Sequence, residues 1–72
     1  MKLTKKTKPT LAGRDLKNYR NSLTMSEKEF GDLIGVTYQA VRLWESGERR
    51  IPETTVRLVR LFQKFPQLLS EF

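Results

Sequence analysis

Residues 26–47 read SEKEFGDLIGVTYQAVRLWESG and predict two short helices joined by a sharp turn. Ser26, with a glutamate three residues later, forms the capping-box pattern of a helix N-terminus. Apolar residues then recur at a spacing of three to four, which is the helical period. Gly35 suits the left-handed conformation that ends a helix at a tight turn. The pattern therefore predicts one helix over residues 27–34 and a second over residues 38–46.

The second predicted helix has an inner and an outer face. Its inner face is apolar and carries Ala40, Val41 and Trp44. The opposite side, called the outer face below, carries a phenol, an amide, a guanidinium and an apolar side chain: Tyr38, Gln39, Arg42 and Leu43. Such groups recognise the edges of base pairs in the major groove. We therefore predict a helix-turn-helix whose outer face reads DNA bases; the alternative is an ordinary helical hairpin with a solvated face.

Three cations in or directly after this unit are candidates for contacts to DNA phosphates. Lys28 lies in the first turn of the first helix, where free backbone amides can also hold an anion. Arg49 and Arg50 follow the second helix directly. Basic residues beside a base-reading helix usually fix its position on the phosphate backbone. The alternative for the two arginines is a solvated charge cluster.

The lack of cysteine and histidine excludes several kinds of site. Neither residue occurs in the 72-residue chain, so neither disulfides nor a thiolate metal site can brace its small core. The eight carboxylates form no obvious pair in an apolar setting, as acid–base catalysis would need. We expect no enzyme activity, no catalytic residues, no metal and no cofactor. No apolar run reaches the length of a membrane span and no signal peptide is visible, so we expect a cytoplasmic protein.

The positive charge is concentrated at the N-terminus. The chain has a net charge of +6, and four of its lysines lie in the first ten residues, without an acidic residue among them. This composition predicts a disordered basic arm over residues 1–10, which either lies on DNA or acts as a solubilising tail. A basic peptide on an anionic membrane would explain the arm but not the capped turn. We therefore expect a nucleic-acid partner and no membrane.

The rest of the chain predicts an all-α domain of four to five helices over residues 11–72, a compact bundle that contains the helix-turn-helix. Residues 11–22 and 53–65 have helical apolar spacing, and no strand-like alternation is present. Arg20 lies at the edge of the inward stripe of the first of these helices. We predict that it pairs with Glu45, because a partly buried guanidinium usually needs a carboxylate. The alternative is two unrelated surface charges.

The C-terminal part carries more apolar surface than one small core can bury. Apolar residues spread over more than half the circumference of the helix over residues 53–65, and more follow Pro66. We predict a homodimer interface formed by Phe65, Leu68, Leu69 and Phe72. The tail can instead fold back on its own core, or the surface can meet another protein.

The segment LTMSEKEFGDLIGVTYQAVRLWESGERRIP resembles the Cro and phage-repressor (XRE) type of helix-turn-helix domain. The resemblance covers about Leu16 to Phe65. It rests on an arginine in the first helix, the capped second helix, the Gly-Val turn, the Trp-Glu pair that closes the third helix, and the Gly and Pro that follow. The tail VRLVRLFQKFPQLL is similar to that of antitoxin regulators from toxin–antitoxin operons.

The resemblance implies roles for particular residues. Positions 38, 39 and 43 commonly read bases in such families, while Thr37 and the loop after the third helix contact phosphates. The Arg20–Glu45 pair is commonly structural. Two positions depart from the pattern: Glu27 stands where a phosphate-binding glutamine is common, and Leu43 where a polar residue is common. Gln39 and Arg42 are then the best candidates for base readers.

Two functions are therefore expected. The main one is a sequence-specific regulator of transcription, a homodimeric repressor that binds a palindromic double-stranded DNA operator through the major groove. The alternative is an antitoxin-like protein that binds and neutralises a partner toxin, as well as or instead of regulating its operon.

Overall fold

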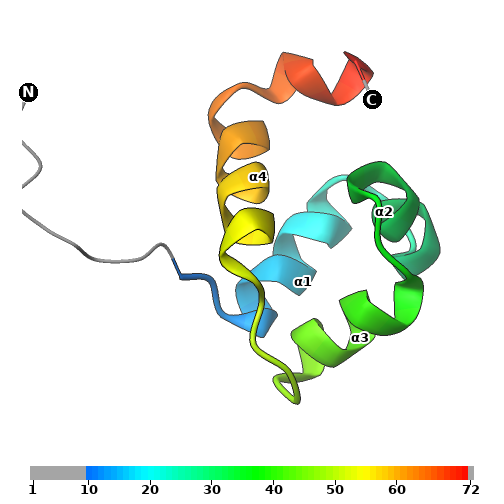
Figure 1. The fold of residues 1–72 in the computed structure, drawn as a ribbon. Coiled ribbons are helices and arrows are strands. Elements are labelled where there is room, and N and C mark those ends of the chain that lie inside the picture. The colour runs from blue at the N-terminus through cyan, green and yellow to red at the C-terminus, as the bar shows by residue number, and fades with distance from the viewer. Residues whose placement is uncertain (1–9, 72) are drawn as a thin grey trace, which may run out of the picture.

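The computed structural model describes residues 10–71, and this part of the chain is helical without strands (Figure 1). It contains four α-helices and a 3-10 helix: α1 (Gly13–Ser22), α2 (Glu27–Ile34), α3 (Tyr38–Ser46), α4 (Glu53–Lys64) and η1 (Pro66–Glu71). The all-α prediction is thus confirmed. The predicted basic arm, except Thr10, and Phe72 of the predicted dimer interface lie outside the described residues.

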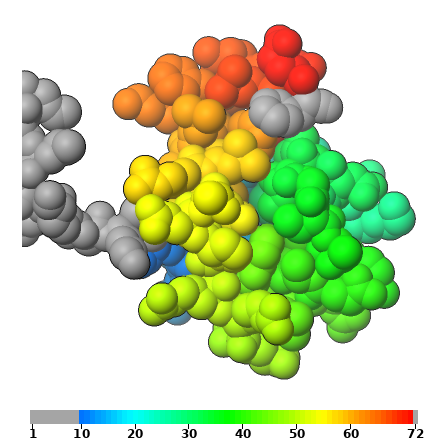
Figure 2. Space-filling view, in the orientation of Figure 1, coloured from blue at the N-terminus to red at the C-terminus, as the bar shows by residue number. Residues whose placement is uncertain are grey.

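A single apolar core joins the four α-helices. Its eight buried members come from every α-helix and from the loop before α4: Leu16, Phe30, Val41, Trp44, Ile51, Val56, Val59 and Phe62. In Figure 1, α4 lies at the left and α2 and α3 at the right, with α1 between them in this view. Figure 2 shows the side chains of α4 packed against those of the α2–α3 half. No helix within residues 10–71 is long and apolar enough to cross a membrane.

Helix α1 begins two residues later than the sequence predicts, at Gly13 instead of Leu11. The start of α1 lies directly against the end of α3. A Cβ atom added at Gly13 would overlap the carbonyl oxygen of Trp44 and lie 2.8 Å from that of Glu45. Periodicity within one helix carries no information about this approach between two helices, which only a residue without a side chain permits.

Helix α4 ends at Lys64, one residue before the predicted boundary, because Pro66 disfavours the helical conformation at Phe65. Phe65 has φ −128° and ψ 75°. The inner side of α4 is buried in the core, whereas Leu61 is 43% and Phe65 40% exposed. The helix therefore carries apolar surface that the described core leaves uncovered, as its broad apolar arc predicts.

Candidate nucleic-acid interface

The turn between α2 and α3 is built by two glycines. Gly35 has φ 83°, and its amide donates to the carbonyl oxygen of Gly31 at 2.8 Å. A Cβ added at Gly31 would lie only 2.7 Å from the carbonyl oxygen of Val36. Gly31 therefore lets the turn lie directly on α2, and Gly35 reverses the chain without strain. Together they set the angle between α2 and α3.

The start of α2 closes on itself through the predicted capping box. The Ser26 hydroxyl oxygen accepts from the Glu29 amide at 3.0 Å, and the Glu29 carboxylate accepts from the Ser26 amide at 2.8 Å. These two amides are therefore not free to bind a phosphate. Lys28 is exposed, but its Nζ lies 3.2 Å from Oδ2 of Asp32. A phosphate at this position must compete with that carboxylate.

Helix α3 is anchored from inside and leaves its outer face free. Val41 is fully buried and Trp44 is 5% exposed, so these two side chains fix the rotation of α3 about its axis. Three outer-face side chains, Tyr38, Gln39 and Arg42, are exposed, and Leu43 is half-buried. A shallow depression of about 370 Å³ lies at this face. It is lined by Gln39, Arg42, Leu43, Ser46 and Glu48.

The N-cap of α3 keeps one hydrogen-bonding group available. Thr37 Oγ1 accepts from the Ala40 amide at 3.2 Å. A hydroxyl that accepts one bond still has its own hydrogen to donate. Thr37 is exposed at the end of α3 where the helix dipole is positive. The group is thus suited to an anionic oxygen.

Arg20 and Glu45 form a buried bidentate ion pair between α1 and α3. Arg20 Nε and Nη2 donate to the two carboxylate oxygens of Glu45 at 2.7 and 3.0 Å. Arg20 Nη1 donates to the Met25 carbonyl oxygen at 2.8 Å, and the whole residue is 7% exposed. The hydrogen-bonded Glu45 carboxylate raises the pKa of Arg20 despite the opposing effect of burial. The pair therefore ties α1, the loop before α2 and the end of α3 together.

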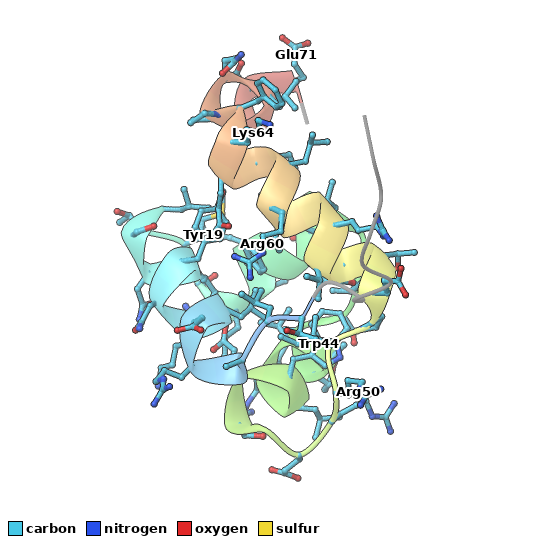
Figure 3. The ribbon with its side chains drawn as sticks, turned by 90° about the vertical axis from the view of Figure 1, so that its left-hand side faces the viewer. Tyr19, Trp44, Arg50, Arg60, Lys64 and Glu71 are labelled. Carbon is cyan, nitrogen blue, oxygen red and sulfur yellow. The ribbon has the colours of Figure 1, made fainter. Side chains whose placement is uncertain are left out.

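The loop after α3 is held against the helix end. Gly47 has φ 85°, and the Arg49 amide donates to the Leu43 carbonyl oxygen at 3.1 Å. Arg49 and Arg50 are both exposed. In Figure 3, the Arg50 side chain points away from the bundle while Trp44 lies toward its interior. The two exposed arginines thus follow the end of α3, and the backbone at Arg49 is held against that helix.

The structure brings together one pair that the sequence analysis missed. Oε1 of Glu27, at the start of α2, lies 3.8 Å from Nε of Arg42 in α3. The side chain of Arg42 is 64% exposed and that of Glu27 35%. The available signal was the departure at position 27, an acidic residue beside predicted DNA-binding cations. Helical periodicity could not pair it with Arg42, because the two residues belong to different helices.

Comparison with known proteins identifies the family of this chain. The family model described as the antitoxin component of a bacterial toxin–antitoxin system, MqsA, matches residues 1–72. The chain belongs to the MqsA antitoxin family. It is similar to antitoxin MqsA of Escherichia coli (strain K12), with 29% identity over 62 residues. The alignment covers 86% of this chain and 47% of that protein, so the chain spans about half the length of this relative.

Membership in the MqsA family changes the order of the two expected functions. The antitoxin alternative, which the sequence analysis placed second, is the one that the family supports better than a stand-alone repressor. The similarity of the tail to antitoxin regulators agrees with this result. The DNA contacts assigned to individual residues and the homodimer remain predictions.

Proposed function

We propose that this chain is a DNA-binding antitoxin that recognises an operator sequence through the outer face of α3. The proposal is carried by one observation: α3 presents Gln39 and Arg42 to solvent while Val41 and Trp44 lock its other side in the core. A rigid helix with a free polar face is what direct readout in the major groove requires. The family of the chain supports a role in a toxin–antitoxin system.

Each outer-face side chain has a chemical role in this proposal. The Gln39 amide makes paired hydrogen bonds to adenine, and the Arg42 guanidinium does so to guanine. Tyr38 and Leu43 contact thymine methyl groups or the groove wall. The Thr37 hydroxyl, Arg49, Arg50 and Lys28 bind phosphates and set the register of α3 on the duplex.

The apolar C-terminal surface supports a homodimer. Leu61 and Phe65 are exposed, and Leu68 and Leu69 of η1 are half-buried. Leu61 also borders a depression whose other lining residues are cationic: Arg57, Arg60 and Lys64. Because the cationic surfaces of two copies would repel each other, the dimer contact runs through Phe65, Leu68 and Leu69. Two copies would then place their α3 helices in major grooves about 34 Å apart on a palindromic operator.

Toxin binding is the second candidate function, and family membership favours it. The same apolar surface can meet a toxin instead of a second copy. The two functions are compatible if the toxin binds elsewhere. The oligomeric state shows whether this surface contacts a second copy or a toxin, because a stable dimer already covers it.

Substitutions at Gln39 and Arg49 test the DNA-binding role. Gln39→Ala should lower the binding free energy by about 1–3 kcal/mol through one base pair, because it removes a bidentate base contact. Arg49→Ala should weaken binding to all sequences alike and reduce the slope of affinity against salt concentration by about 1. Duplexes selected from a random pool by the wild-type chain provide the substrate, and titrations at several salt concentrations provide the measurement. If Gln39→Ala loses the same affinity on every sequence, Gln39 is not one of the residues that read bases.

Substitution of Phe65 tests the dimer. Phe65→Glu should raise the dimer dissociation constant by about tenfold or more, because it places a charge at the proposed contact and removes an aromatic anchor. Light scattering of the purified chain over a concentration series gives the measurement. Thr54→Glu, at an exposed position of α4 outside this surface, is the matched control. A monomeric wild-type chain would refute the homodimer and leave the surface free for a toxin.

A further inference from the structure

The contact between Glu27 and Arg42 joins the two helices of the proposed DNA-binding unit. Glu27 is the first residue of α2, and Arg42 lies in the middle of α3. The carboxylate oxygen Oε1 is 3.8 Å from Nε of the guanidinium, which is an ion-pair distance longer than a hydrogen bond. Within residues 10–71, no hydrogen bond engages the two terminal nitrogens of Arg42. The contact with the carboxylate thus involves Nε and leaves the two terminal nitrogens of Arg42 without a hydrogen bond.

The backbone that carries Glu27 is held in place. The capping box at Ser26 and Glu29 fixes the backbone of the first turn of α2. Glu27 also attracts the buried Arg20, and this attraction contributes to the raised pKa of Arg20. The Glu27 carboxylate is therefore within electrostatic range of two guanidinium groups, Arg20 of α1 and Arg42 of α3. Its 35% exposure agrees with a partly enclosed position.

A tethered arginine reads a base better than a free one. Fixing a long, flexible side chain on binding has an entropic cost, which is smaller when the side chain is already oriented. Guanine recognition uses two nitrogens of the guanidinium in one plane. A carboxylate near Nε restricts the rotation of that plane and leaves Nη1 and Nη2 for O6 and N7.

We propose that Glu27 is a positioning residue that orients Arg42 for its base and thereby sets the sequence preference of this surface. The inference rests on the proposed DNA-binding function. Glu27 itself makes no base contact. Glu27 of α2 acts on Arg42 of α3. The angle between these two helices is set by the turn glycines, Gly31 and Gly35.

The test is a double-mutant cycle on DNA discrimination. The base pair read by Arg42 is identified as the one whose preference is lost in Arg42→Ala, using duplexes selected by the wild-type chain. In the wild-type background, Glu27→Gln should lower discrimination at that base pair by about two- to tenfold, the effect of ordering one long side chain. In the Arg42→Ala background, Glu27→Gln should leave discrimination unchanged. Discrimination at the other base pairs should stay the same in both backgrounds.

Two further variants separate positioning from simple charge repulsion. Glu27→Asp keeps the negative charge but shortens its reach, so positioning predicts a loss of discrimination similar to that of Glu27→Gln. Asp32→Asn removes a carboxylate from the same helix, one that faces Lys28 and not Arg42, and should leave discrimination unchanged. Circular dichroism of each variant verifies that the helices are intact.

The outcomes are distinguishable. If Glu27→Gln raises affinity for every duplex equally and does so in both backgrounds, Glu27 acts only by repulsion and the inference is overturned while DNA recognition stands. Wild-type discrimination in Glu27→Asp would overturn it as well. If the wild-type chain selects no sequence at all, the proposed function fails and the inference fails with it.

Discussion

Replacing Glu45 with alanine is expected to destabilise the fold by about 3–5 kcal/mol, because it leaves the Arg20 guanidinium buried without a countercharge. The side chains of the pair are only 9% and 5% exposed, so water cannot replace the lost carboxylate without opening the contact between α1 and α3. A domain of this size has a total stability of about 4–10 kcal/mol. The substitution should therefore remove about a third or more of the stability of the domain.

Urea unfolding followed by the fluorescence of Trp44, the only tryptophan of the chain, measures this loss. The matched control is Glu53→Ala, which removes the carboxylate of an exposed pair with Arg57 on α4. Such surface pairs contribute less than about 1 kcal/mol. A loss for Glu45→Ala no larger than that of the control would show that the buried pair does not hold α1 and α3 together.

Replacing Trp44 with alanine should have an effect of similar size, about 3–5 kcal/mol. Trp44 is 5% exposed and lies on the side of α3 opposite the outer face. The cavity left by its indole would open in the apolar core that the four α-helices share. Since only Val41 and the ion pair of Glu45 would then hold the rotation of α3, DNA affinity should fall together with stability.

Thermal unfolding followed by far-ultraviolet circular dichroism gives the stability, because this variant has no tryptophan fluorescence. Trp44→Phe retains an aromatic ring in the same position and should lose less than half as much stability. Equal losses for the two variants would argue against a cavity as the cause. Undiminished sequence discrimination in Trp44→Ala would contradict the anchoring role.

The capped helices of the DNA-binding unit were predictable because their signals are local. The bounds of α2 and α3 match the predicted residues 27–34 and 38–46. Each of these helices begins after a capping serine or threonine and ends before a glycine. The outer face followed from the rotation per residue within one helix. Exposure of Gln39 and Arg42 needed nothing beyond the apolar positions opposite them.

Contacts between helices were less predictable, because no regular spacing relates residues of different helices. The Arg20–Glu45 pair could be anticipated only from the chemistry of a cation at the edge of an apolar stripe. The pairing of Glu27 with Arg42 and the approach of Gly13 to the end of α3 were not anticipated. Both depend on the crossing angles of helices, which the packed core sets.

Local chemistry in the chain was thus sufficient for the helices, their ends and the side of α3 that faces solvent, because hydrogen bonds and steric limits within a few residues govern these features. Tertiary packing alone settled where α1 begins, how deeply Arg20 is buried and which carboxylate faces Arg42. The physical reason is that side chains distant in the chain meet only after the apolar faces of the helices have come together and excluded water.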